Sequence, residues 1–271
     1  GTFNTAVGSA VLDANTTASN NNAFGYGALT NNTTGASNCA FGRDSLNENT
    51  TSSNNSAFGH DALGANTTGT QNTAVGAAAL QDQTTANHNT ALGAFAATDT
   101  TGSDNVAVGR ISLYVNTTGG GNTAIGTEAL RRNTTGSNNV AVGKQALSSN
   151  TTGQNNVALG TQALLTNQTG GNNIGLGNTA LYFTSGSNNV AIGNGSQFNT
   201  RAANDNTSVG NQSLSANTTG AENTAVGSLA LNAATTANYN TAIGRSALKL
   251  TTTGGANVAV GNNALLSNTT G

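Results

Sequence analysis

The chain has 271 residues and a formal net charge of −2, and only 7% of its residues are charged. So few lysines and arginines argue against a protein that binds nucleic acid or an anionic membrane surface by electrostatic attraction. No apolar run approaches the roughly 20 residues of a membrane-spanning helix, so we expect no membrane span in this segment.

One short phrase recurs from the first residues to the last. A glycine that follows a bulky apolar residue occurs 16 times, from Gly8 to Gly261, at intervals of 17 residues. Only the intervals that end at Gly109 and Gly193 have 16 residues. We number positions relative to this glycine, which is position 0. The sequence predicts one array over residues 1–271 without distinct capping sequences, and we expect it to be a segment of a longer chain or fibre.

Each position of the repeat has its own residue preference. Position −2 is alanine in nearly every copy, position −1 is Val, Ile, Leu or Phe, and position +4 is leucine in nearly every copy. Charged residues avoid −4 to 0, +3 and +4, which are therefore predicted to be packed. Position −4 is always asparagine: Asn4, Asn21, Asn38, Asn55, Asn72, Asn89, Asn105, Asn122, Asn139, Asn156, Asn173, Asn189, Asn206, Asn223, Asn240 and Asn257.

These preferences predict an all-β protein. Seventeen residues are too few for a helical-hairpin repeat. The alternation of small and bulky residues before the glycine predicts a short strand, the Ala-Leu pair a second extended or turn segment, and Asn-Thr-Thr a turn. Because one such unit cannot bury its apolar face alone, we predict a parallel β-solenoid (a β-roll) of 16 coils, assembled side by side or end to end.

The columns also predict what fills the interior. The asparagines at −4 are expected to hydrogen-bond to one another in a ladder along the axis. The bulky residues at −1 and the leucines at +4 are expected to form the core, so that alanine at −2 points outward as a contact surface between protomers. Glycine at 0 is expected at a corner that needs positive φ or a close backbone approach. Representative core residues are Phe24, Phe41, Phe58, Leu29, Leu46 and Leu63.

The segments "NNVAVG" (Asn138–Gly143) and "NNVAIG" (Asn188–Gly193) resemble the head repeats of trimeric autotransporter adhesins. The resemblance runs through all copies, although the repeat of this chain is longer than the usual one by an Asn-Thr-Thr turn. It implies a left-handed parallel β-roll, three chains side by side, and a place on a bacterial surface or a phage fibre.

No catalytic or metal-binding constellation is evident in the sequence. His60 and His88 lie in different coils and are expected to be exposed loop residues, and Cys39 takes a position where other copies have small or β-branched residues. We therefore predict a protein that is not an enzyme and needs no cofactor or metal.

The turns carry formal N-glycosylation sequons, expected on an exposed surface, although asparagine and threonine also suit turns for their own backbone bonding. The acceptor asparagines are Asn15, Asn32, Asn49, Asn66, Asn116, Asn133, Asn150, Asn167, Asn217 and Asn268.

The function predicted from the sequence is that of a non-enzymatic extracellular structural protein, a repeat segment of a surface fibre, a filament or an adhesin head. Its expected partners are copies of itself, as a trimer or a filament, and a host surface or matrix. The alternative is an ice-binding solenoid, which would use the threonines at +8 and +9. Adjacent side chains of an extended segment diverge, so these two columns do not form one flat face.

Overall fold

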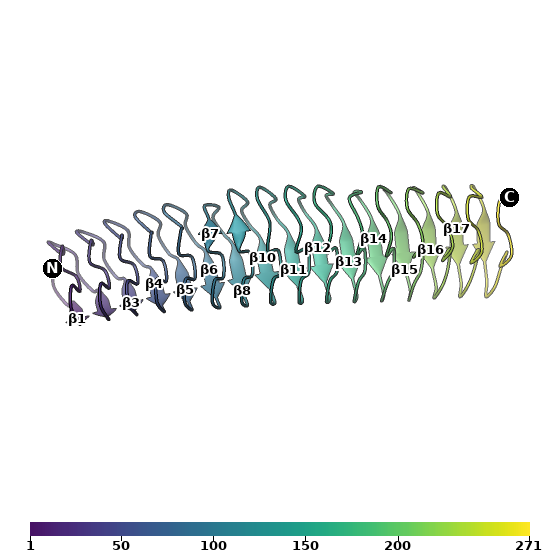
Figure 1. The fold of residues 1–271 in the computed structure, drawn as a ribbon. Helices are drawn as coiled ribbons and strands as arrows, with labels where there is room; N and C mark the ends of the chain where they lie inside the picture. The colour runs from purple at the N-terminus through teal and green to yellow at the C-terminus, as the bar shows by residue number, and fades with distance from the viewer. The chain divides into compact units, whose positions relative to one another are not determined.

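The computed structural model describes residues 1–271 and shows an all-β parallel β-solenoid of about 15 turns, with a ~17-residue repeat and no helix (Figure 1). The predicted fold class is therefore confirmed. No helix in the structure has the length and apolarity needed to cross a membrane. Contacts divide the chain into two units, Gly1–Thr135 and Gly136–Gly271, and each is described by itself.

The first unit has a parallel sheet to which each coil adds one strand, in the order β1-β2-β3-β4-β5-β6-β8-β10, and a separate two-stranded sheet of β7 and β9. The strands are β1 (Thr5–Val7), β2 (Asn22–Phe24), β3 (Cys39–Phe41), β4 (Ser56–Phe58), β5 (Thr73–Val75), β6 (Thr90–Leu92), β7 (Asp99–Thr100), β8 (Val106–Val108), β9 (Val115–Asn116) and β10 (Thr123–Ile125).

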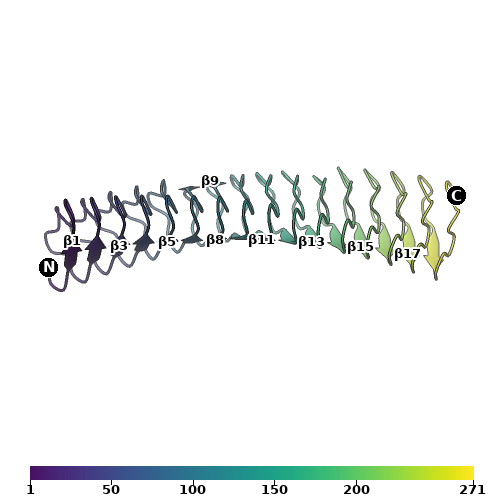
Figure 2. The same ribbon diagram turned by 60° about the horizontal axis from the view of Figure 1, so that its bottom comes forward.

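The second unit repeats the same arrangement, with consecutive strands paired in parallel (Figure 2). Its strands are β11 (Val140–Val142), β12 (Val157–Leu159), β13 (Ile174–Leu176), β14 (Val190–Ile192), β15 (Thr207–Val209), β16 (Thr224–Val226), β17 (Thr241–Ile243) and β18 (Val258–Val260).

Each of these principal strands covers only positions −3 to −1, where β-branched residues are common. The register is set by the repeat, so Ala158 pairs with Gly175 and Leu159 with Leu176. It is kept across the shortened intervals, where Thr90 pairs with Val106. The missing residue is therefore absorbed outside the strand.

The Ala-Leu segment at +3 and +4 is a turn and not a second strand. Its backbone still bonds to the next coil, as in Leu29 N–H to Ser45 O (3.1 Å). The chain bends there through left-handed backbone at −5, +2 and +4, for example at Gln145 (φ 58°) and Leu147 (φ 54°). This conformation costs an L-residue about 1–2 kcal/mol. The full burial of the Leu147 side chain stabilises the fold by a comparable amount, about 1.5–3 kcal/mol.

The interior is filled by smaller side chains than the sequence indicated. It holds alanine at −2 and in most coils at +3, leucine at +4, and asparagine at −4 and +7. Leu29, Leu46 and Leu63 are fully buried, in agreement with the expected core.

Position −1 points outward, which corrects two expectations. Phe24 and Phe41 are only half-buried and Phe58 is 39% exposed, so these rings are not in the core. Alanine at −2, which was expected to face another protomer, is buried inside its own coil. Successive side chains of a strand point to opposite faces. Once the small residue at −2 points inward, the bulky residue at −1 must point outward.

The glycine at position 0 has the conformation and the crowding expected of a corner. At Gly160, φ is 135°, and a Cβ would lie 2.5 Å from the carbonyl oxygen of Gly177 in the next coil. A side chain would therefore meet backbone that cannot move without disturbing the next coil.

Replacing Gly160 by alanine is expected to lower the free energy of unfolding by roughly 3 kcal/mol, from backbone strain and overpacking. The matched control is Gly195→Asn, because φ at Gly195 is 61° and Asn263 already adopts φ 55° at the same position of its coil. Chemical denaturation followed by circular dichroism measures both. Equal losses in the two variants would contradict this account of position 0.

Candidate functional site

Two columns of buried asparagine hold the walls of each coil together. The Nδ2 of Asn156, at −4, donates to the carbonyl oxygen of Gly170 (2.9 Å), and the Nδ2 of Asn167, at +7, donates to the same oxygen (2.9 Å). The Oδ1 of Asn156 accepts from the backbone N–H of Asn173 (3.0 Å). The −4 asparagines are buried, apart from the half-buried Asn4 and Asn257.

Direct amide-to-amide bonds link part of the −4 column, as expected for a ladder. The Nδ2 of Asn156 also lies 3.1 Å from the Oδ1 of Asn139, and the Nδ2 of Asn223 lies 3.1 Å from the Oδ1 of Asn206. However, the bonds from each amide to backbone groups are the more constant feature. The column is therefore part of the scaffold and offers no free amide to a ligand.

The second asparagine column is the set of sequon asparagines, and it is not exposed. A glycan is attached through Nδ2, yet here Nδ2 donates to backbone inside the coil, as in Asn32 to Gly35 O (2.9 Å). The expectation of an exposed acceptor was wrong, because the asparagine completes the coil. Asn32, Asn49, Asn66, Asn116, Asn133, Asn150, Asn167 and Asn217 are fully buried, and Asn15 and Asn268 are half-buried.

The threonines at +8 also use their polar groups internally. The Oγ1 of Thr33 donates to Thr50 O (3.0 Å), and the Oγ1 of Thr67 donates to Thr84 O (3.1 Å), one coil further along. This column is thus a second link between coils and not a row of hydroxyl groups free for a ligand.

The outward residues of the principal strands form what we call the outer face, positions −3 and −1 in each unit. No residue of either column is charged. Bulky apolar side chains are substantially exposed on it, including Leu92 (48%) in the first unit and Leu159 (49%) in the second. Phe24, Phe41 and Phe58 stack on one another there, with ring centroids 4.5 and 5.1 Å apart. Cys39 is half-buried in β3 of the same face.

The two borders of the outer face carry opposite charges. At −5 the charged residues are all acidic: Asp104, Asp205 and Glu222. At +1 they are all basic: Arg43, Arg110, Lys144 and Arg245. His88 lies on the acidic border, with its Nδ1 3.2 Å from an oxygen of Asp104.

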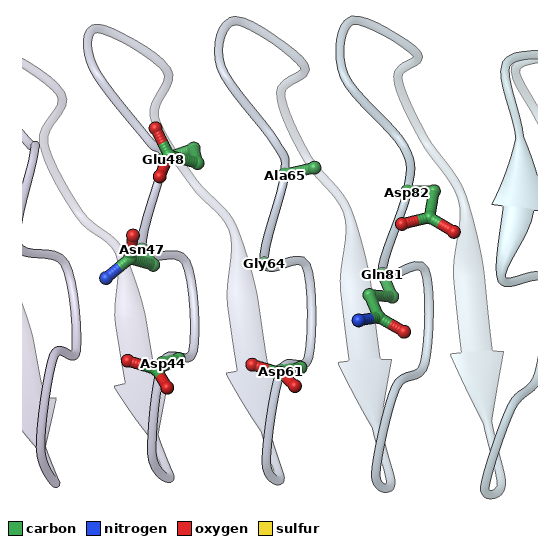
Figure 3. A pocket seen from close by; sticks show the side chains of 8 residues that line it. All are labelled: Asp44, Asn47, Glu48, Asp61, Gly64, Ala65, Gln81 and Asp82. Atoms are coloured by element: carbon green, nitrogen blue, oxygen red, sulfur yellow. The ribbon is translucent and has the colours of Figure 1, made fainter.

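An acidic hollow of about 300 Å³ lies on another side of the first unit. Figure 3 shows Asp44 and Asp61 at the same level of neighbouring coils, with Glu48 and Asp82 further along their loops. The hollow is lined by Asp44, Asn47, Glu48, Asp61, Gly64, Ala65, Gln81 and Asp82.

Stacking brings His60 beside two residues of this lining, and ligand atoms of Asp44, His60 and Asp61 lie within 4.8 Å of one another. From the sequence, His60 was expected to be an exposed loop residue, and its proximity to Asp44 and Asp61 was not predicted. The signal available was the 17-residue separation of Asp44 and Asp61, which places them side by side. An imidazole and two carboxylates are ligands that a divalent metal accepts. Here the carboxylates already pair with His60 Nδ1 (3.0 Å) and Arg43 Nε (2.9 Å), which accounts for the cluster without an ion.

Comparison with protein-family models, curated protein sequences and solved structures found no significant match. The columns of the repeat and the geometry of its surfaces therefore carry the functional interpretation.

Asn156→Ala is expected to lower the free energy of unfolding by about 2–4 kcal/mol. It leaves the buried N–H of Asn173 without a partner and removes one of two donors to Gly170 O. The control is Asn194→Ala, at an exposed position of the same unit. Denaturation curves of both variants measure the difference, and an unchanged midpoint for Asn156→Ala would contradict the structural role of the column.

The carboxyl of Asp82 gives a pH-dependent prediction. Partial desolvation raises the pKa of Asp82 above its ordinary value, and so do a hydrogen bond that its neutral carboxyl donates to Asp99 and the repulsion between the two carboxylates. The folded state therefore favours the neutral form, and this contribution to stability is present at acidic pH and lost as pH rises through the raised pKa.

Asp82→Asn is therefore expected to raise the unfolding midpoint relative to the parent protein at neutral pH, with the difference shrinking on acidification. Asp13→Asn, at an exposed carboxylate in another coil, controls for net charge. Thermal unfolding across a pH series measures the effect. A difference that does not vary with pH would show that the neutral form of Asp82 is not favoured.

Proposed function

We propose that this chain is a non-enzymatic structural protein of the cell surface, a repeat segment of an extracellular fibre, filament or adhesin head that assembles with copies of itself. The observation that carries the proposal is the outer face, which in each unit continues over successive coils without a charged residue. The resemblance to adhesin heads supports the extracellular location and a host surface or matrix as a further partner.

An apolar surface of this kind is costly to leave in water. Exposed contiguous apolar patches on soluble proteins mark interaction sites, and obligate interfaces are the more hydrophobic ones. Because every coil presents the same two columns at the same spacing, a parallel copy of the chain matches it coil by coil. This favours a second copy of the same chain over an unrelated globular partner.

The charged borders favour a head-to-tail arrangement around an axis. A self-complementary two-fold contact uses the same patch on both copies, whereas a heterologous contact joins two different patches and closes into a ring. Acidic residues on one border and basic residues on the other fit the heterologous contact. Asp104 and Arg110 belong to the same coil, so parallel copies in register would bring Asp104 of one copy near Arg110 of the next. A ring of three agrees with the adhesin resemblance.

Ice binding is a second candidate, on a different surface from the one the sequence suggested. The threonines at −3 point outward beside apolar residues at −1, as in the consecutive strands that begin at Thr207, Thr224 and Thr241. Threonine fills this position in seven of the 16 copies, and valine or isoleucine interrupts the row. A thermal hysteresis assay distinguishes the two functions, because only an ice-binding protein depresses the freezing point below the melting point.

Leu159→Lys is expected to disrupt the assembly, because it places a charge in the middle of the outer face at a side chain that is 49% exposed. Light scattering coupled to size exclusion should show an oligomer for the parent protein and a monomer for Leu159→Lys. Ser149→Lys, at position +6, adds the same charge away from the outer face and should leave the oligomer intact. A parent protein that stays monomeric at its highest soluble concentration would refute the proposal.

A further inference from the structure

The two shortened intervals of the repeat coincide with two hollows lined by aromatic rings and arginine, one in each unit. The first aromatic hollow has a volume of about 250 Å³ and is lined by Phe95, Arg110, Ile111, Tyr114 and Arg131. The second aromatic hollow has a volume of about 290 Å³ and is lined by Thr166, Gln168, Phe183, Thr184, Ser185 and Arg201.

The second aromatic hollow is built on a cluster of three rings. Tyr182 stacks on Phe198 with centroids 5.0 Å apart, and Phe183 packs edge-on against both at 4.5 and 5.5 Å. The guanidinium of Arg201 lies over the Phe183 ring, 5.7 Å from its centroid. The ring cluster thus holds an arginine in place at the rim of the hollow.

Arg201 has no carboxylate partner in the protein, since the ion pairs involve only Arg43, His60 and His88 as cations. A guanidinium with one face covered by a ring and its N–H edge unpaired is arranged to bind a planar or tetrahedral anion through two parallel hydrogen bonds. A second polar group also lacks a partner, because the hydroxyl of Thr184 in the lining is buried and forms no hydrogen bond.

The first aromatic hollow has the same chemistry although its residues occupy other positions of the repeat. Arg110 and Arg131 both line it without an ion-pair partner, beside Phe95, which is 43% exposed, and the half-buried Tyr114. In each unit, unpaired arginine thus lies beside aromatic rings next to a shortened coil, and the arginines belong to the coils that follow it. The hollow among regular coils is acidic.

We propose that each aromatic hollow binds an anionic saccharide, a sugar ring that carries a carboxylate or a sulfate. The arginines take the anionic group, and the aromatic rings cover an apolar face of the sugar. Volumes of about 250 and 290 Å³ lie just below the usual range of pockets for drug-sized ligands and suit one sugar ring. A peptide bound as an added strand would need an unpaired strand edge, whereas β13 and β14 beside the second aromatic hollow are paired on both sides.

Binding at the second aromatic hollow does not depend on the proposed assembly, whereas Arg110 of the first hollow also belongs to the basic border. The lining residues lie between +1 and +8 of their coils, whereas the outer face uses −3 and −1. Ligand binding and oligomerisation are therefore measured separately, and either can fail while the other holds.

The test is titration calorimetry of the full chain at low salt with sialyllactose, a heparin-derived tetrasaccharide and neutral lactose. An anionic saccharide is expected to bind with two sites per chain, and lactose is not. Arg201→Ala should weaken one site at least about ten-fold, so that the apparent stoichiometry falls to one. Arg131→Ala should do the same for the other site.

Two further variants separate binding chemistry from net charge and from folding. Lys249→Ala removes a half-buried cation of the second unit that lies outside the hollow and outside the basic border, and it should leave both sites unchanged. Arg201→Lys keeps the charge but loses the planar fork and should bind weakly. Circular dichroism confirms that each variant is folded.

Three results would overturn the proposal. They are equal binding of lactose and the anionic sugars, binding that survives the Arg131→Ala/Arg201→Ala double substitution, and no binding of either anionic sugar at millimolar concentration. Tighter, Arg201-dependent binding of an oligoglutamate peptide would assign the hollow to acidic peptides instead.

Discussion

The rest of the structure depends on the convergence of two asparagine side chains on one backbone carbonyl. Asn156 and Asn167 approach Gly170 O from two parts of the coil and draw its walls together. A buried amide that loses its partners is costly, and the −4 column is asparagine in all 16 copies. Position +7 is less strict, since Gln83 makes the same bond to Ala86 O (2.9 Å). The same contact sets the width of the interior. With asparagine inside, only a small residue fits at −2, which is alanine in most copies, and its larger neighbours turn outward.

The fold could be predicted from the sequence because the repeat length excludes helical hairpins and the alternation before each glycine favours a strand. Hydrophobicity could not predict which of the alternating residues faces the interior. A rule that puts the larger apolar residue inside places Phe41 in the core, whereas the structure has Ala40 there and Phe41 outside. The position of Asn38 predicts the observed orientation, because residues two apart on a strand share a face and Ala40 is two residues after Asn38. The polar side chain, and not the apolar one, marks the inside of this solenoid.

Clusters that form by stacking of coils could not be predicted from single copies of the repeat. Asp44, His60 and Asp61 look scattered along the chain, yet stacking makes them neighbours. The same holds for Phe183 and Arg201, which belong to successive coils. The sequon asparagines show the opposite error. Read singly, Asn32 is an acceptor on a turn, whereas as a member of a column it is part of the interior.

The shortened intervals explain why the aromatic hollows lie where they do. In a regular coil, the asparagine at +7 bonds to the carbonyl three residues further on, as Asn167 does to Gly170. In the two shortened coils the carbonyl bonded by the coil's own −4 asparagine lies only two residues after position +7, and threonine stands at +7 as Thr100 and Thr184.

Neither threonine hydroxyl has a partner, so the bond between +7 and the carbonyl is missing from both coils, as it is at Thr200 in a coil of full length. The strand register is unchanged, because Asn89 and Asn173 still bond to the carbonyls of Gly102 and Gly186 (2.9 and 2.8 Å). A coil can therefore lose one tie and one residue from its loop and stay in the stack. Each shortened coil carries a bulky ring in this loop or beside it, Phe95 in the first unit and Phe183 in the second, and the coils that follow place Arg110 and Arg201 against those rings.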